Sequence, residues 1–311
     1  MKKLTLALLA AAVLFAAPSW AKEGSDQYVF GAETWLAGAA PPPGQFYVNY
    51  FGGYAGKLKD GSGDNALLAG STPTANATFN VFRLLEMTHL RLLGAQYGMH
   101  AVVPLVYQSV NMNGAAGITG VGDIFLDPFI MAWHRPQWHA AASVNFIVPT
   151  GAYNASDPRV SIGAHYYSFD PLVAVSYLPK SHWEGSAILM YNVKTTNPAT
   201  NYHSGQEFHT DYAVGKHLGR WMLGTTGYAL KQTTNDTVNG QIAPAAPGLW
   251  TAGREGQVLA IGPSAAWSNR RHMTFISQWQ HETLVRNRFG GDKFWFKAII
   301  PVDGLFSRHS E

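Results

Sequence analysis

Glu207, His209 and Asp211 are the residues whose types and spacing come closest to a site for chemistry. They stand at every second position, and alternate side chains of a β-strand point to the same face. Two carboxylates and an imidazole in such a row could hold a metal ion. A polar row is also the ordinary lining of a β-barrel lumen, and we expect no metal and no other cofactor in this chain.

The acidic residues Asp123 and Asp127 form a second candidate pair. Four positions of an extended strand separate them by about 13 Å, at roughly 3.3 Å per residue. That distance is too long for two carboxyl groups that share a proton. We therefore expect pairing with lysine across the strands rather than acid–base catalysis.

Common catalytic motifs are absent from the sequence. It contains no G-x-S-x-G nucleophile turn, no phosphate-binding G-x-x-x-x-G-K-[ST] loop and no H-E-x-x-H zinc helix. His203 and Ser204 could be read as the pair of a barrel lipase, but neighbours on a strand point to opposite faces. We expect no catalytic residues, and a lipase-type outer-membrane enzyme is the least favoured alternative.

The stretch from Val121 to Thr150 shows most clearly which elements must position these side chains. Its first half alternates with period two, so that one face carries Asp123, Phe125, Asp127, Phe129 and Met131, and the other Ile124, Leu126, Ile130 and Ala132. After a short turn around Pro136, the alternation resumes from Trp138 to Val148. This pattern predicts a hairpin of two long strands, each apolar outside and mixed polar inside.

The rest of the chain repeats this hairpin. We predict strands at 44–54, 78–91, 96–107, 121–134, 138–149, 165–178, 183–194, 205–217, 221–233, 256–268, 272–283 and 292–302. The phases of 78–91 and 221–233 are the least clear. The connections alternate between long and short, and 284–291 is a fairly long one. An even number of strands with this loop asymmetry is typical of an all-β transmembrane barrel with short periplasmic turns and long extracellular loops.

Aromatic and basic residues follow the same asymmetry. Trp138, Trp183, Trp221 and Trp267 stand beside the short turns, as an aromatic girdle at a membrane interface would. A large soluble β-sandwich would also explain alternating strands. It would explain neither the loop asymmetry nor the placement of the tryptophans, so the barrel is favoured.

The two chain ends and the composition limit the protein class. Lys2 and Lys3, an apolar run and Ser19-Trp20-Ala21 predict a signal peptide over 1–21, hence export. Without those two lysines, 20 basic residues face 19 acidic ones, a balance that argues against nucleic-acid binding. Only 13% of residues are charged, there are 32 glycines, and there is no cysteine, which excludes a disulfide framework.

Alternation assigns a set of polar and aromatic residues to the inner face, because a charge that faces lipid is costly. The set is Asp123, Phe125, Asp127, Phe129, Asp170, Glu184, Asn192, Glu207, His209, Asp211, Gln278, Gln280, Glu282, Lys293, Trp295 and Lys297, with Lys194 beside them. These residues could line a solute path. They could equally form a static network of ion pairs and hydrogen bonds in a narrow barrel.

Residues 22–43 precede the first strand and end in Pro41-Pro42-Pro43. They carry four large apolar side chains, those of Tyr28, Phe30, Trp35 and Leu36. Burying such a side chain is worth about 1.5–3 kcal/mol. We therefore expect this periplasmic segment to insert into the periplasmic opening of a 44–302 barrel as a plug. A disordered leader or a partner-binding stub is the alternative, and 303–311 is expected to be a C-terminal tail.

Short motifs along the chain resemble those of one protein family. They are Pro41-Pro42-Pro43-Gly44, Gly122-Asp123-Ile124, Asp127-Pro128-Phe129, Trp133-His134, Pro149-Thr150-Gly151, Tyr177-Leu178-Pro179, Ser204-Gly205-Gln206-Glu207, His209-x-Asp211-Tyr212-Ala213-x-Gly215 and Gly291-Asp292 with Trp295-x-Lys297. In this order they resemble the putative meta-pathway of phenol degradation family, SphA-like outer-membrane transporter proteins. The resemblance implies a barrel in the outer membrane of a Gram-negative bacterium, associated with uptake of aromatic or other apolar compounds.

The sequence and this resemblance together predict a channel for passive uptake of small apolar or aromatic compounds. A general porin for polar solutes is the alternative. The expected partners are membrane lipid, lipopolysaccharide, the outer-membrane assembly machinery and the small solute itself.

Overall fold

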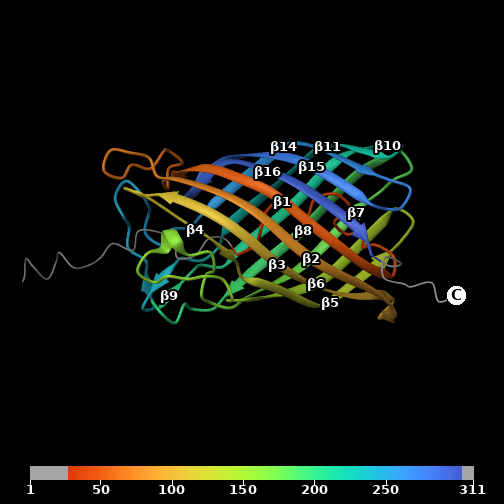
Figure 1. The fold of residues 1–311 in the computed structure, drawn as a ribbon, viewed down its shortest axis with the longest axis horizontal. Helices are drawn as coiled ribbons and strands as arrows, with labels where there is room; N and C mark the ends of the chain where they lie inside the picture. The colour runs from red at the N-terminus through yellow and green to blue at the C-terminus, as the bar shows by residue number, and fades with distance from the viewer. Residues whose placement is uncertain (1–26, 303–311) are drawn as a thin grey trace, which may run out of the picture.

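The computed structural model describes residues 27–302. The predicted signal peptide, residues 22–26 and the tail at 303–311 lie outside the described residues. Twelve long strands form one antiparallel sheet that closes where β1 pairs with β16 (Figure 1). They are β1 (Gly44–Lys59), β2 (Thr74–Leu92), β3 (Ala95–Asn111), β5 (Ile124–His134), β6 (Trp138–Val148), β7 (Ser168–Tyr177), β8 (Trp183–Lys194), β10 (Glu207–Leu218), β11 (Trp221–Gln232), β14 (Gln257–Ser268), β15 (Thr274–Arg286) and β16 (Arg288–Pro301).

The predicted barrel of twelve strands is therefore confirmed, including the two ranges whose phase was least clear. Short elements lie among the long connections: β4 (Ala115–Val121) extends the sheet beside β3, and β9 (Tyr202–His203), β12 (Thr237–Val238) and β13 (Gln241–Ile242) form a small second sheet. A single 3-10 turn, η2, spans Pro158–Val160. Within residues 27–302, no helix has the length and apolar character needed to cross a membrane.

The barrel has two different ends. Connections 93–94, 135–137, 178–182, 219–220 and 269–273 define the short-turn end, and 60–73, 112–123, 149–167, 195–206 and 233–256 define the long-loop end. The prediction of a fairly long loop at 284–291 is wrong. β15 and β16 both run on into it and leave only Asn287 between them. Asn287 and Leu284 both have positive φ, and these two left-handed residues allow the tight reversal.

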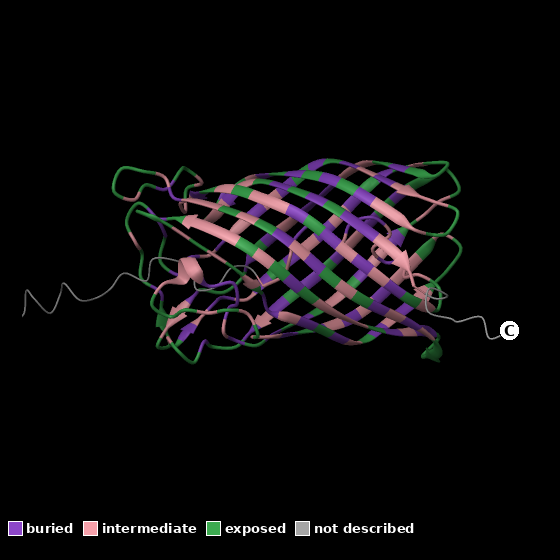
Figure 2. Ribbon diagram, in the orientation of Figure 1, coloured by how far each residue is buried: buried purple, intermediate pink, exposed green. Residues whose placement is uncertain are grey.

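Buried and exposed side chains alternate along the strands, as Figure 2 shows. Glu184, Ser186 and Ile188 of β8 are buried inside, whereas the neighbouring Trp183 is 52% exposed on the outside. Trp138 and Trp221 are exposed in the same way beside the short turns. An apolar outer face with aromatic residues at its edge is what a lipid-facing barrel requires.

One predicted inner residue, Phe129, lies on the outer face and is 60% exposed. The register of β5 shifts against β3 between His100 and Gly98, and against β6 between Leu126 and Met131. Pro128 has no N–H to donate to the sheet, and a bulge at this point moves every later residue to the opposite face. Ile130 is consequently buried inside, where strict alternation would have placed it outside.

Candidate solute path through the barrel

The N-terminal segment, residues 27–43, lies inside the lumen and runs along its length. At the long-loop end the Gln27 amide donates to Asp123 (2.8 Å) and accepts from Ser168 (2.5 Å). At the short-turn end the Gly38 N–H donates to Ser176 Oγ at 2.9 Å. The segment therefore reaches farther than an insertion into the periplasmic opening alone, and its role as a plug stays a proposal.

Strand residues hold the middle of the segment through its backbone. Asp211 accepts hydrogen bonds from the N–H groups of Gly31 (2.8 Å) and Glu33 (3.2 Å). Gln278 and Gln280 both donate to the carbonyl oxygen of Gly31. A segment without regular secondary structure needs such partners, since an unpaired buried backbone group costs about as much as a lost hydrogen bond.

The aromatic side chains of the segment fill spaces that the wall leaves open. Trp35 is 4% exposed and donates its indole N–H to Ser264 Oγ at 2.8 Å. Gly215 and Gly224 make room for it, because a Cβ atom on either would come within 3.0 Å of the Trp35 ring. Phe30 stacks on Tyr228 with ring centroids 5.9 Å apart. This packing explains how Trp35 and Phe30 are kept out of water.

A charge cluster ties the segment to three strands at mid-depth. Glu33 accepts from Arg83 Nη1 of β2 at 2.8 Å and from Lys297 Nζ of β16 at 2.6 Å, and Tyr50 of β1 donates its hydroxyl to the same carboxylate. Each buried charge thus has an opposite partner, which a low-dielectric interior requires. The sequence reasoning missed Glu33 and Arg83. Arg83 is the one charge among the alternate residues of β2 that face inward, and this was the available signal.

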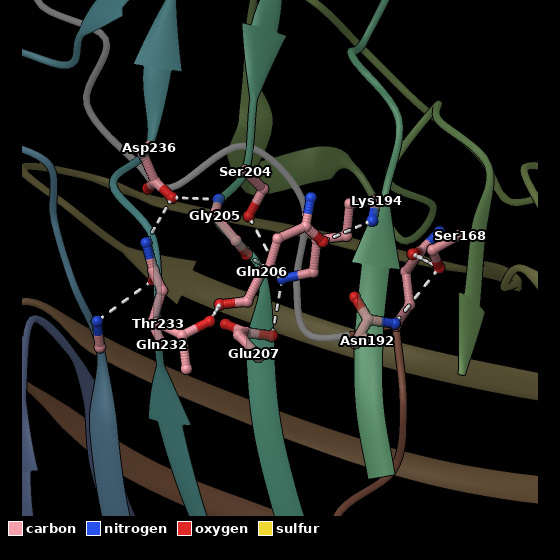
Figure 3. Close-up of polar contacts among 12 residues, drawn as sticks. Ser168, Asn192, Lys194, Ser204, Gly205, Gln206, Glu207, Gln232, Thr233 and Asp236 are labelled. Atoms are coloured by element: carbon pink, nitrogen blue, oxygen red, sulfur yellow. Dashed lines mark hydrogen bonds and ion pairs between the residues drawn. The ribbon is translucent and has the colours of Figure 1, made fainter. Parts of the chain in front are cut away.

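A second polar network lies where β8, β10 and β11 reach the long-loop end (Figure 3). Lys194 Nζ and Glu207 Oε2 are 2.6 Å apart, and both side chains are about as buried as core residues. Lys194 also donates to the Gly205 carbonyl at 3.0 Å, and Asn192 donates to Asp170. These contacts join three neighbouring strands and the loop before β10 through buried polar side chains.

Loop residues continue this network beyond the strands. Gln232 and the Gly205 N–H both donate to Asp236, and Tyr202 of the small sheet donates its hydroxyl to the same carboxylate. Burial raises the pKa of the Tyr202 hydroxyl well above its usual value, and the Asp236 carboxylate raises it further. The hydroxyl therefore stays protonated, as a donor to Asp236.

Apart from Phe129, the predicted inner residues are all buried on the inner face. Most of them contact the N-terminal segment or one another rather than open space. Glu184 accepts from the Leu36 N–H, and Lys293 donates to the Phe30 carbonyl at 3.2 Å. Asp127 accepts from Ser143 and from the Phe129 N–H, so it caps the bulge of β5. Their use as a path for solute stays a proposal.

Glu207, His209 and Asp211 do not form one site but have three separate roles. Glu207 pairs with Lys194, Asp211 holds the segment, and His209 packs between Tyr28 and Phe30 with centroid distances of 4.7 and 5.0 Å. Neither ring nitrogen of His209 has a hydrogen-bond partner within residues 27–302. In the described part of the chain, no three His, Asp or Glu side chains are grouped as metal ligands would be.

Within residues 27–302, two of the cavities lie beside the segment. The larger, about 530 Å³, extends to the short-turn end, where Pro301 and His272 line it. The smaller, about 290 Å³, extends to the long-loop end, where Met112 and Trp250 line it. The residues common to both linings are Tyr28, Val29 and Val81. These residues of the segment and β2 therefore lie between the two cavities, at a place that is called the constriction below.

Comparison with known proteins adds four findings. The family model described as "Putative MetA-pathway of phenol degradation" matches residues 55–298. The COG4313 outer membrane channel from Pseudomonas putida F1 has a similar fold, with a TM-score of 0.69 and 14% identity over 88% of this chain and 99% of that one. A FadL homologue from Pseudomonas aeruginosa has a TM-score of 0.39 and 9% identity over 92% of this chain and 99% of that one. The search of curated proteins found no match.

Proposed function

The chain belongs to the family described as "Putative MetA-pathway of phenol degradation", and from this premise we propose that it is an outer-membrane channel for passive uptake of small apolar or aromatic compounds. The observation that carries the proposal is the pair of cavities that extend to opposite ends of the barrel and share Val29 and Val81 in their linings. A small displacement of the N-terminal segment there would join them into one path.

The lining of the larger cavity supports an apolar solute. Leu85, Met87, Val102, Phe125 and Ile130 contribute to it. Its charged groups near the constriction are already paired in the Glu33 cluster. A general porin needs a wide aqueous constriction with separate rows of charge, and a lumen filled by residues 27–43 favours this alternative less.

The apolar outer face and the tryptophans at the short-turn end support a place in the outer membrane. In this setting the short turns would face the periplasm, and the long loops would face the outside and contact lipopolysaccharide. Membrane lipid and the outer-membrane assembly machinery would be further partners. We propose that the protein has neither catalytic activity nor a cofactor.

Val81→Trp tests the proposed path, because the larger side chain would fill the constriction between the two cavities. In proteoliposomes we expect the wild type to speed the entry of toluene and phenol and not that of sugars. We expect V81W to lose most of this entry. Val173→Trp is the matched control, since Val173 is 49% exposed on the outer face.

Heat-modifiable mobility on gels would show that both variants form a closed barrel. Fast swelling with sugars and no effect on toluene or phenol would favour the porin instead. Equal entry of these compounds through folded wild type and V81W would contradict the proposed path.

A further inference from the structure

The two ends of the barrel carry formal charges of opposite sign. Within residues 27–302, the five long-loop connections contain six acidic residues and two basic ones, whereas the five short-turn connections contain five basic residues and no acidic one. Arg91 and Lys216 stand within three residues of a short turn and add two further cations. We call the seven cations of this end the basic collar: Arg91, Arg135, Lys180, Lys216, Arg220, Arg270 and Arg271.

The basic collar has no carboxylate partner within residues 27–302. All seven side chains are exposed, and none of them forms an ion pair in this part of the chain. Two carboxylates lie in the strands near this end. Glu184 is buried and lies 2.6 Å from His217, and Glu86 is half-buried on the outer face of β2. The collar therefore keeps an excess of positive charge.

Tryptophan side chains mark the depth of the collar in the membrane. Trp138, Trp183 and Trp221 are half-exposed on the outer face beside the short turns. Lys216 stands opposite Trp183 in the register of β10 and β8, and its Nζ lies 5.8 Å from the centroid of that ring. Tryptophan is enriched at the depth of the lipid headgroups, and lysine can extend its charge from an apolar face to that depth. The collar therefore stands at the headgroup layer.

The charges of the collar are close enough to act together. The order of the strands places the turns of β5–β6, β7–β8, β10–β11 and β14–β15 two strands apart in succession. Two strands span about 10 Å, at roughly 4.8 Å per strand. This spacing is near the Debye length of about 8 Å at physiological ionic strength, so the potentials of neighbouring turns overlap. Clusters of basic residues beside a membrane attract anionic lipids in this way.

We infer that the basic collar binds phospholipids with anionic headgroups in preference to zwitterionic ones. The phosphate accepts hydrogen bonds from lysine and arginine, the negative net charge of the headgroup matches the excess charge of the collar, and the acyl chains pack on the apolar outer face. A soluble acidic protein is the other class of partner for a basic surface, but Lys216 and Trp183 lie on the lipid-facing side. The inference rests on the membrane placement given with the proposed function, and not on the uptake of a solute.

Native mass spectrometry of the whole protein in detergent tests this preference, with dioleoyl phosphatidylglycerol and dioleoyl phosphatidylethanolamine as probes. We expect the wild type to bind the anionic lipid about fivefold more tightly, the factor that one basic residue near an anionic surface is worth. Lys180→Gln, Lys216→Gln and Arg220→Gln together should reduce the preference to about twofold, because part of the collar remains. In the wild type, raising ammonium acetate from about 0.1 M to about 1 M should reduce it too, since the Debye length falls from about 10 Å to about 3 Å.

Lys57→Gln, Lys231→Gln and Arg286→Gln together are the matched control, because they remove two exposed lysines and one exposed arginine near the long-loop end. This variant should keep the wild-type preference. Heat-modifiable mobility would establish that each variant is folded. Equal binding of both lipids by the wild type, or the same preference in the two triple variants, would overturn the inference and favour an acidic protein partner. If such a protein still takes up toluene, the proposed function stands without this lipid preference. Recovery of the protein as a soluble species without detergent would refute the membrane placement itself.

Discussion

The carboxylate of Asp211 accepts the backbone N–H of Gly31 at 2.8 Å, a hydrogen bond between residues 180 positions apart. It fixes the N-terminal segment at the middle of the lumen. Asp211 is fully buried, and its second oxygen accepts the Glu33 N–H. One side chain of the wall therefore holds the backbone that separates the two cavities.

Asp211→Ala should loosen the segment, because it leaves two buried N–H groups without partners, at about 1–3 kcal/mol each. We expect more frequent opening and a higher mean conductance in planar bilayers. Asp292→Ala is the control, since Asp292 is half-exposed on the outer face. Identical conductance of folded D211A and D292A would show that this hydrogen bond does not hold the segment.

Gly31→Ala tests the same contact from the segment. Gly31 has φ +80°, and a Cβ atom would lie 2.1 Å from Gln280 Oε1. The left-handed conformation alone costs a non-glycine residue about 1–2 kcal/mol. We expect increased conductance with an unchanged barrel. Gly185→Ala, where a Cβ meets nothing within 4 Å, should behave as the wild type. Wild-type conductance of G31A would mean that the segment accommodates the added Cβ atom without leaving its position.

Lys194→Ala should destabilise the barrel by about 3–5 kcal/mol, because it leaves the buried Glu207 without its cation. The midpoint of urea unfolding in detergent should fall. Lys194→Met combined with Glu207→Leu should recover most of the loss. Lys231→Ala is the control, since Lys231 and Glu255 are 4.0 Å apart and exposed. Equal effects of K194A and K231A would contradict a structural role for the buried pair.

Phe129→Arg tests the bulge in β5. On the lipid-facing side an arginine costs up to about 2–4 kcal/mol, depending on depth. We expect poor assembly of F129R and a lower unfolding midpoint. Met131→Arg serves as a comparison. Met131 lies on the same strand after the bulge and on the same outer face as Phe129. Normal assembly of F129R would instead agree with an inward Phe129.

Alternation along the chain was enough to predict the twelve strands and the inner position of residues such as Asp170 and Gln280, because lipid accepts one face only. It failed at Phe129, since the phase change depends on how Pro128 is accommodated by both neighbouring strands. Alternation also failed to predict the tight turn at Asn287, because that turn depends on the left-handed backbone of Leu284 and Asn287.

The contacts of the N-terminal segment could be foreseen only in part. Its large apolar residues indicated burial in the barrel. The pairing of Glu33 with Arg83 and Lys297 joins three distant parts of the chain and depends on the depth that the segment reaches. Local sequence patterns carry no information on that depth.

Deleting Lys22 to Ala40 and recording single-channel conductance in planar bilayers tests the central claim most directly. That claim is that the N-terminal segment occupies the lumen and limits passage through it. Heat-modifiable mobility of the deleted protein would first establish a closed barrel. The structure predicts a clear rise in conductance, because the segment and its side chains no longer separate the two cavities. Unchanged conductance from a correctly folded deletion would contradict the claim.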